Sequence, residues 1–262
     1  MKFTVNKDAF EKAIIPVSII AQSKSAESAL SGIYMRAENN QILLYCYDVE
    51  KGIKTSVDAD VSSEGCIIAD PQIVPIIHSM PEGDVEFSCD DKFVITLTCG
   101  DATFQIMGRD GSTYPDMPEI QGHTAFAITK KQFKNLINKT FFSISKDDSN
   151  PLLKGALFEI KDNTLTVTAI DGFRFAVRKE KSAVDCPDVS LSFILPGKAE
   201  QNLLRIMDDS DSEIAFELGN KHIIVHMDNL YIMIRLIDGE FPRYERYVPE
   251  YLLKAEVDRD AL

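Results

Sequence analysis

The chain has 262 residues, of which 45% are hydrophobic and 26% are charged, as in a soluble globular protein of about two domains. It contains no run of about 18 apolar residues and no secretory signal at its start, so we expect a cytoplasmic protein without a membrane span. The formal net charge of −13 argues against a uniformly basic nucleic-acid-binding protein, although binding depends on where the basic groups lie.

The spacing of apolar residues predicts two helices in each half of the chain. In chain order, we expect a helix over residues 7–22, a strand over 41–47, a helix over 71–80, a strand over 94–97, a helix over 129–145, a strand over 164–170, a helix over 196–208, and strands over 223–226 and 230–236. Pro16 lies inside the first helix and is expected to kink or shorten it. Each half is therefore predicted to be mostly β, with two helices.

The two halves are copies of one unit. A shift of 123 positions aligns residues 4–48 with residues 127–171 without a gap. The identical pairs that anchor this alignment are Lys7/Lys130, Phe10/Phe133, Ile14/Ile137, Leu30/Leu153, Gly32/Gly155, Asn40/Asn163 and Asp48/Asp171. Internal repeats indicate tandem domains, which we place at residues 1–122 and 123–250.

The last residues resemble the start of the unit. Residues 257–262 follow the pattern of residues 5–10 and 128–133. We therefore expect residues 251–262 to be a linker and the first residues of a third unit whose remainder is absent, and the encoding gene to continue for roughly one more unit.

Basic residues gather on the outer faces of the second unit's helices. One face of the helix predicted over 129–145 is apolar, and the opposite face carries the basic residues. The basic residues of the two helices are Lys131, Lys139 and Lys146, with Lys130 and Lys134 at the flanks, and Lys198 and Arg205 on the second helix. No acidic residue lies between Lys130 and Lys146 in the sequence.

The first unit is less basic, because acidic residues interrupt its first helix. It offers Lys7, Lys12 and Lys24, but Asp8 and Glu11 lie among them. For any single lysine, the exposure of a helix face to solvent is a sufficient explanation of its position. Two basic faces in so acidic a chain favour a surface for a phosphate backbone, bound without sequence preference.

No catalytic motif stands out. The sequence has no glycine-rich phosphate loop and no nucleophile elbow. His222 and His226 are four residues apart but lack a nearby third metal ligand. Asp48 and Asp171 occupy equivalent repeat positions, as in a two-lobed aspartic hydrolase. The residues after them do not form the turn of such a dyad, so strand-end turns are the alternative.

Two further observations limit the classes of function. Five cysteines without a Cys-x-x-Cys pair predict reduced thiols rather than disulfides or a zinc site: Cys46, Cys66, Cys89, Cys99 and Cys186. A β-rich protein-interaction module that does not bind DNA remains open as a third class of function.

Several segments resemble the bacterial DNA polymerase III β subunit family, the DNA sliding clamps. They occur in family order over the whole chain. The segments are residues 1–5 (MKFTV), 114–118 (YPDMP), 150–155 (NPLLKG), 169–177 (AIDGFRFAV), 194–199 (ILPGKA) and 235–244 (RLIDGEFPRY). The last three are specific to this family rather than to β-rich domains in general.

The resemblance implies an α+β fold with two tandem copies of a β-rich clamp (processivity-fold) domain, each with two helices lining a DNA hole. It also implies three such domains per subunit and a head-to-tail homodimer of complete subunits that closes a ring, which we do not expect the two units alone to form. Partners would be double-stranded DNA, the DNA polymerase III α subunit, the clamp loader and other proteins with clamp-binding motifs. We expect a nucleoid-associated protein with no cofactor, metal or catalytic residue. The DNA-facing residues would be Lys24, Lys131, Lys139, Lys146, Lys198 and Arg205.

The resemblance also implies a partner-peptide pocket between the second and third domains. Carried over residue by residue, its second-domain half would be Leu153, Ile170, Gly172, Phe173, Arg174, Phe175, Pro242, Arg246 and Tyr247. Ordinary packing is the alternative for Leu153, Ile170 and Phe175. Exposed apolar residues beside the two arginines suit short peptides with apolar anchors.

Overall fold

The structure is a computed structural model that describes residues 1–21, 30–118, 124–147, 149–181, 190–244, 253, 255–258 and 260. The first unit contains β1 (Lys2–Asn6), α1 (Lys7–Ala21), β2 (Ile33–Glu38), β3 (Gln41–Tyr47), β4 (Lys51–Asp58), β5 (Asp60–Ser63), β6 (Gly65–Ala69), α2 (Ile73–Ser79), β7 (Asp84–Cys89), β8 (Val94–Cys99), β9 (Ala102–Asp110) and the 3-10 turn η2 (Gly111–Thr113). The second contains β10 (Thr124–Thr129), α3 (Lys130–Asn138), η3 (Phe141–Ser143), η4 (Pro151–Lys154), β11 (Gly155–Lys161), β12 (Thr164–Ile170), β13 (Phe175–Lys181), β14 (Leu191–Pro196), α4 (Gly197–Ile206), β15 (Glu213–Leu218), β16 (His222–Met227) and β17 (Leu230–Arg235).

One long sheet joins the two units. Within the described residues its strand order is β10-β15-β16-β17-β4-β3-β2-β6-β9-β8-β7-β1-β5, and a second sheet has the order β13-β12-β11-β14. The junction is the antiparallel pair β17 and β4, in which Tyr231 lies opposite Lys54 and Ile234 opposite Lys51. The amide of Arg235 also donates to the carbonyl of Glu50 at 2.7 Å. Backbone hydrogen bonds therefore fix how the units meet.

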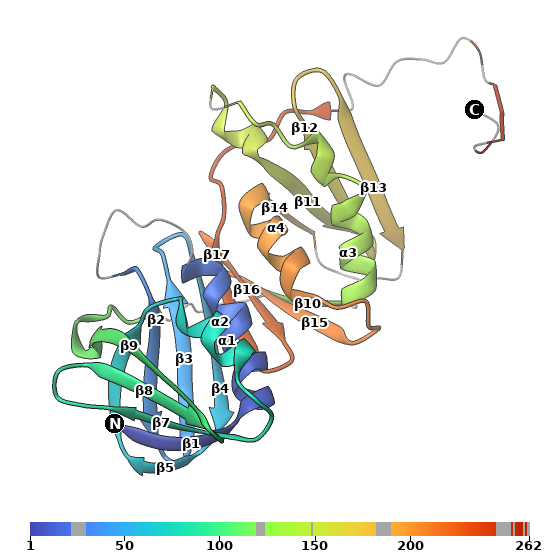
Figure 1. Cartoon of the computed structure of the whole chain (residues 1–262). Helices are drawn as coiled ribbons and strands as arrows, with labels where there is room; N and C mark the ends of the chain where they lie inside the picture. The colour runs from blue at the N-terminus through green and yellow to red at the C-terminus, as the bar shows by residue number, and fades with distance from the viewer. Residues whose placement is uncertain are drawn as a thin grey trace.

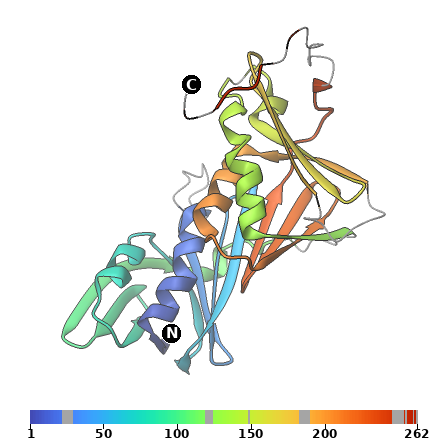
Figure 2. The same cartoon turned by 90° about the vertical axis from the view of Figure 1, so that its right-hand side faces the viewer.

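The helices pack against the sheets of their own units (Figures 1 and 2). In Figure 2, α1, α4 and α3 follow one another in a row, with strands of the sheet beside them. Helix α1 packs on β3 and β4, and α4 packs on β11 and β14. No helix of the described chain is long and apolar enough to cross a membrane.

The aromatic cores of the units correspond. Phe3 stacks on Phe87 with ring centroids 4.4 Å apart, and Phe126 stacks on Phe216 at 4.6 Å. Each pair joins the first strand of a unit to the strand that follows its second helix. These rings are almost completely buried, which keeps the repeated strands in the same register.

Helix α1 runs through Pro16 to Ala21, so the shortening expected of this proline was wrong, and the alternative expectation of a kink stays a prediction. A proline at this position removes the amide that would bond to the carbonyl of Lys12. Lys12 is exposed, so water can reach its part of the helix. The buried side chains of Ile14, Val17 and Ile20 hold the helix against the sheet on the other side.

The helix predicted over residues 129–145 is too long. Helix α3 begins with a capping box between Thr129 and Gln132 and ends at Asn138. The buried Thr140 hydroxyl donates to the carbonyl of Leu136 at 2.8 Å, and the chain continues as the 3-10 turn η3. Side-chain bonding of this kind competes with helix continuation. Lys139 is thus the helix cap, and Lys146 lies beyond the helix.

The remaining expected elements are confirmed. Strands β3 and β12 have the predicted bounds, and β8, β16 and β17 differ from prediction by one or two residues at their ends. Helices α2 and α4 lie inside the ranges predicted for them. The predicted start of a third unit falls largely outside the described residues, and those described there form no helix or strand.

Candidate nucleic-acid and peptide surfaces

Five predicted DNA-facing cations are exposed around the helices of the second unit. Lys131 lies on α3, Lys139 caps it, Lys146 follows η3, and Lys198 and Arg205 lie on α4. Lys131 has an ion pair, because its Nζ is 4.0 Å from Oδ1 of Asp211. The other four have no ion pair within 4.0 Å among the described residues. Lys24 lies outside the described residues.

Two neighbouring lysines are unavailable to a phosphate backbone. Lys130 is 3% exposed, and its Nζ lies 2.7 Å from Oδ2 of Asp228 and 3.5 Å from Oδ2 of Asp208. Lys134 pairs with Asp209 and donates to the carbonyl of Met207. The sequence around Lys130 contains no acids, but the loop after α4 and the β16–β17 turn supply them. The basic face is therefore smaller than predicted.

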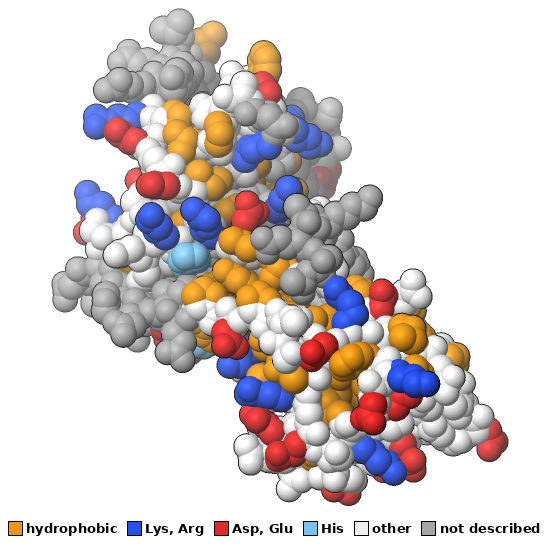
Figure 3. All heavy atoms as spheres, turned by 90° about the vertical axis from the view of Figure 1, so that its left-hand side faces the viewer, with side chains coloured by type: hydrophobic (Ala, Val, Ile, Leu, Met, Phe, Trp, Pro, Cys, Tyr) orange, Lys and Arg blue, Asp and Glu red, His pale blue; other side chains and the backbone are white. Residues whose placement is uncertain are grey.

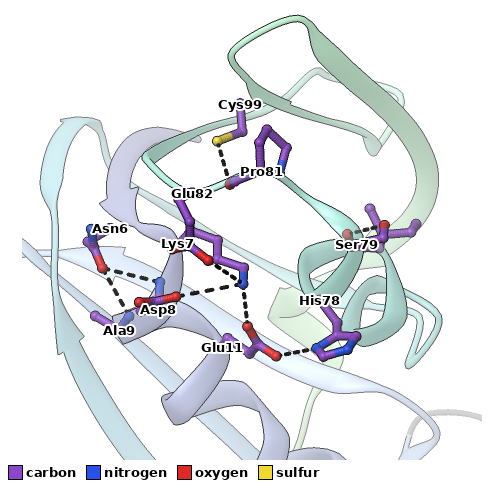
Figure 4. A network of polar contacts seen from close by, with 11 residues as sticks. Asn6, Lys7, Asp8, Ala9, Glu11, His78, Ser79, Pro81, Glu82 and Cys99 are labelled. Carbon is purple, nitrogen blue, oxygen red and sulfur yellow. Dashed lines mark hydrogen bonds and ion pairs between the residues drawn. The ribbon is translucent and has the colours of Figure 1, made fainter.

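The corresponding helix of the first unit carries an ion-pair network rather than a free basic face (Figure 4). Lys7 Nζ lies 2.8 Å from Oε2 of Glu11, 3.6 Å from Oδ1 of Asp8 and 3.7 Å from Oε1 of Glu82. The hydrogen bond from Lys7 lowers the pKa of Glu11, and a bond to His78 lowers it further. The same Lys7–Glu11 bond raises the pKa of Lys7. Lys7 and its repeat counterpart Lys130 are thus both neutralised.

Charges of both signs are interleaved elsewhere on the molecule. Figure 3 shows Lys, Arg, Asp and Glu side chains mixed on one face, with hydrophobic side chains between them in the middle of the molecule. A face of this kind is not a uniform positive surface. The concentration of unpaired cations around α3 and α4 is therefore a local property.

The predicted peptide pocket is centred on the hairpin turn between β12 and β13. Oδ1 of Asp171 accepts hydrogen bonds from the amides of Phe173 and Arg174, both at 3.0 Å, and Oδ2 accepts from Nε of Arg174 at 2.8 Å. Gly172 has a φ of +93°, a left-handed conformation that favours glycine. The Phe173 side chain at the tip is fully exposed. This turn presents an apolar ring and an oriented guanidinium to solvent.

The other predicted pocket residues are half-buried or exposed. Leu153 and Ile170 pack partly against the buried cluster of Leu157, Ile194 and Phe241, as ordinary packing would have them. Phe175 is exposed, with its ring centroid 6.4 Å from that of Tyr244. Pro242 is half-buried. Arg246 and Tyr247 lie outside the described residues.

The two repeat-equivalent aspartates form turns, not a dyad. Asp48 accepts from the amides of Glu50 and Lys51 and pairs with Lys51 at 3.2 Å, which is the arrangement of Asp171 with Phe173 and Arg174. The Phe173 amide is the main cause that lowers the pKa of Asp171. A dyad that shares a proton requires one raised pKa. The hydrolase alternative therefore receives no support.

The histidine pair and the cysteines considered from the sequence form no metal site or disulfide among the described residues. His226 lies 3.1 Å from Oε1 of Glu217, and the described residues contain no cluster of three metal ligands. Cys46, Cys66, Cys89 and Cys99 are free thiols, and Cys186 lies outside the described residues.

One exposed aromatic residue was missed by sequence reasoning. Phe142 in η3 is 57% exposed, and the Cζ atom of Arg174 lies 5.9 Å from its ring centroid. The apolar spacing assigns its neighbour Phe141 to a helix face, which assumes that the helix continues. If the helix is ended at Thr140 instead, the helical spacing no longer applies to the residues after it, and exposure of Phe142 could have been predicted.

Family models match both units. The model of the N-terminal domain of the DNA polymerase III beta subunit matches residues 1–118, and that of the central domain matches residues 127–243. The beta sliding clamp of Halalkalibacterium halodurans is 28% identical, in an alignment that covers 95% of this chain and 68% of that protein. The beta sliding clamp of Staphylococcus aureus is 29% identical, in an alignment that covers 98% of this chain and 71% of that protein.

Solved sliding clamps have the same fold. The Bacillus subtilis sliding clamp superposes with a TM-score of 0.89 at 26% identity, covering 96% of this chain and 68% of that one. A Pseudomonas aeruginosa sliding clamp bound to griselimycin gives 0.86 at 25% identity, covering 96% and 68%. The chain thus spans about two thirds of the length of these relatives.

Proposed function

We propose, because the chain belongs to the family of bacterial DNA polymerase III β subunits, that it is a non-catalytic sliding clamp that encircles duplex DNA and tethers the replicative polymerase. The observation that carries this proposal is the group of exposed cations around α3 and α4 in a chain of net charge −13. Lysine and arginine contribute sequence-independent attraction to phosphates. A ring retains DNA by topology, so weak and mobile contacts are sufficient. We place its action at the nucleoid.

We further propose that the sheet continues beyond both units to close the ring. Strand β4 follows the Asp48–Lys51 turn and pairs with β17. Strand β13 follows the equivalent Asp171–Arg174 turn, yet it stands at the edge of its sheet within the described residues. The pairing of β4 with β17 is therefore the template by which β13 would pair with the last strand of a third unit.

The first unit offers the complementary edge. Residues 102–107 of β9 correspond to β17, and in the described structure they pair only with β8. Met107 on this stretch is exposed. An open apolar edge strand is a template for pairing with another chain. We propose that this edge receives the third unit of a partner subunit, which gives a head-to-tail homodimer of domains 1–122, 123–250 and a third domain.

We also propose that the clamp loader, the DNA polymerase III α subunit and other clamp-binding proteins dock at the Asp171–Arg174 turn. Phe173 and Phe175 offer exposed apolar contact, and Arg174 is held in place by Asp171. An apolar anchor beside an oriented arginine is a common arrangement at peptide-binding hot spots. Leu153, Ile170, Gly172, Pro242, Arg246 and Tyr247 complete the proposed half pocket.

The salt dependence of duplex binding tests the DNA surface. Lys131, Lys139, Lys146, Lys198 and Arg205 are replaced together by Ala, and binding of a labelled duplex is measured at several low salt concentrations. Each lost phosphate contact is expected to reduce the slope of log K against log salt by about 0.9, equally for unrelated duplex sequences.

The control replaces two exposed lysines by Ala: Lys161 at the end of β11 and Lys179 on β13. This control variant is expected to bind duplex DNA like the parent. An unchanged slope in the variant that lacks the five cations would favour a β-rich protein-interaction module that does not bind DNA.

A further inference from the structure

A groove lies at the junction of the two units. It has a volume of about 960 Å³ and is lined by the β3–β4 turn of the first unit, the residues after α3, the start of α4 and the end of β17. Apolar side chains of Phe142, Ile144 and Leu236 contribute to its walls. The groove therefore combines a hydrophobic surface with backbone from both units.

Most of the charged residues that line the groove are cationic, whereas the whole chain has a negative net charge. Six cationic residues line it, whereas Glu50 is the one acidic residue among its described lining residues. Lys51 and Arg174 are neutralised by the aspartates of their own turns. Lys146, Lys198 and Arg235 have no ion pair within 4.0 Å among the described residues. The groove thus favours an anionic occupant.

The first-unit wall of the groove is the repeat counterpart of the proposed peptide-binding turn. Glu50 and Lys51 occupy the positions of Phe173 and Arg174, with the same pattern of hydrogen bonds to the first aspartate of the turn. In the second unit the facing wall would come from a third unit. At this junction the facing wall is the second unit itself, so both walls belong to this chain.

We propose that the groove is a second docking site, for a short acidic peptide segment of a partner protein. Phe142 and Leu236 would contact an apolar residue of the peptide, and Lys146, Lys198 and Arg235 would pair with its carboxylates. Extended peptides with alternating apolar and charged residues fit such a surface. This inference rests on the proposed function for the role of the repeated turn in peptide binding, but it concerns a different junction.

Arg174 borders both sites. Its guanidinium is held by Asp171 and lies over Phe142, which lines the groove. A peptide in the groove would compete with Arg174 for the Phe142 ring. Occupancy of the groove is therefore expected to change the exposure of the turn that carries Phe173.

The test uses a fluorescein-labelled octapeptide in which aspartates alternate with leucine and phenylalanine, titrated by fluorescence anisotropy against the 262-residue chain. The same peptide with asparagines in place of the aspartates measures the contribution of charge. The double variant Lys146→Glu and Lys198→Glu is expected to weaken binding of the aspartate peptide by about tenfold or more, and that of the asparagine peptide much less. The charge-matched control, Lys161→Glu with Lys179→Glu, alters lysines outside the groove and is expected to bind like the parent.

Two further arms locate the peptide. Phe142→Ala, which removes part of the apolar wall of the groove, is expected to weaken binding of the aspartate peptide about fivefold or more; an unchanged affinity would place the peptide outside the groove and overturn the proposal. A labelled single-stranded oligonucleotide of thymidines is titrated in parallel. Nucleic acid binding that the groove variants abolish, together with absent peptide binding, would overturn the proposal in favour of a nucleic-acid site. Absence of binding by either ligand would also overturn it.

The outcome is separable from that of the proposed function. A variant that replaces only Lys131, Lys139 and Arg205, none of which lines the groove, tests the DNA surface apart from the groove, and the charge-matched lysines and Phe142→Ala test whether the groove holds the peptide. A chain that binds DNA but not the peptide refutes only the groove. Far-ultraviolet circular dichroism of each variant verifies that it is folded.

Discussion

In the first unit, the turn of residues 48–51 is hydrogen-bonded to the neighbouring unit, whereas in the second unit the turn of residues 171–174 lies beside an edge strand. Both turns have an aspartate that accepts two backbone amides and pairs with a cation three residues later. The carbonyl of Glu50 accepts from Arg235 of the second unit, while Phe173 at the equivalent position is fully exposed. The local sequence determines the turn, and the position in the row of units determines what it contacts.

The helices show the same contrast between shared form and different surroundings. Lys7 and Lys130 begin α1 and α3 at equivalent positions, and both are almost buried in ion pairs. Beyond them, α1 carries Asp8 and Glu11, whereas the surface around α3 and α4 carries unpaired cations. The repeat thus preserves the structural lysine, and the outward charge differs between units.

The largest expected effect on stability concerns a carboxyl group that the second unit buries and the described part of the first unit lacks. Glu200 on α4 is fully buried, and neither carboxyl oxygen has a hydrogen bond of good geometry within the described structure. We expect Glu200→Leu to increase the free energy of unfolding at neutral pH by about 2 kcal/mol, because an unsatisfied buried polar group costs about that much. Urea denaturation measures this difference.

The pH dependence gives a second readout of the same group. Burial raises the pKa of Glu200 well above its ordinary value of 4.5, against a smaller opposing effect of the Ala156 amide. The folded state therefore holds the proton more tightly, and its contribution to stability is full below pH 4.5 and is lost as the pH rises through the folded pKa. Glu200→Gln is expected to remove this part of the pH dependence. Identical profiles for parent and Glu200→Gln would show that the carboxyl is solvated.

A smaller effect comes from exchanging the residues at the left-handed positions of the two turns. Val49 has a φ of +73° and Gly172 a φ of +93°. Val49→Gly is expected to stabilise the chain by up to about 1 kcal/mol, and Gly172→Val to destabilise it by about 1 kcal/mol. No atom lies within 4 Å of the position that a β-carbon would take at Gly172, so the loss would reflect backbone strain rather than a clash.

Thermal or urea unfolding of the two single variants and of the double exchange tests this pair. Effects of opposite sign are expected in the two single variants. Destabilisation by both substitutions would mean that the Val49 side chain packs more strongly than its exposure suggests.

The smallest expected effect is that of Phe173→Ala on stability. The ring is fully exposed, so its removal should change the free energy of unfolding by less than about 0.5 kcal/mol. Its proposed role is in binding a partner, and peptide affinity for the complete pocket should fall although stability does not. A loss of stability above about 1 kcal/mol would instead identify a packing role.

Much of the fold could be predicted because its signals are local. The period-2 runs at residues 41–47 and 164–170 became strands with those bounds, and the 123-residue shift predicted equivalent turns at Asp48 and Asp171. The end of α3 was missed because the apolar spacing continues through Phe141 and Ile144. The buried hydroxyl of Thr140, which bonds back to the helix, stops the helix earlier.

The candidate site was less predictable because charge pairing is long-range. Lys130 and Lys134 lie in a sequence window without acids, yet Asp208, Asp209 and Asp228 neutralise them in three dimensions. The groove between the units could not be foreseen either, since it depends on the pairing of β4 with β17. Residues 24, 246 and 247 keep the status of predictions because they lie outside the described structure.

Retention on circular and linear DNA tests the central claim most directly. This chain, extended by the third unit that the family resemblance implies, is loaded onto a nicked circular plasmid at moderate salt, and the plasmid is then cut once with a restriction enzyme. If the protein encircles DNA, it remains on the circle and is lost from the ends after linearisation, although the phosphate contacts are unchanged. Equal retention on circular and linear plasmid would contradict the account, because binding would then depend on contact rather than on a closed ring.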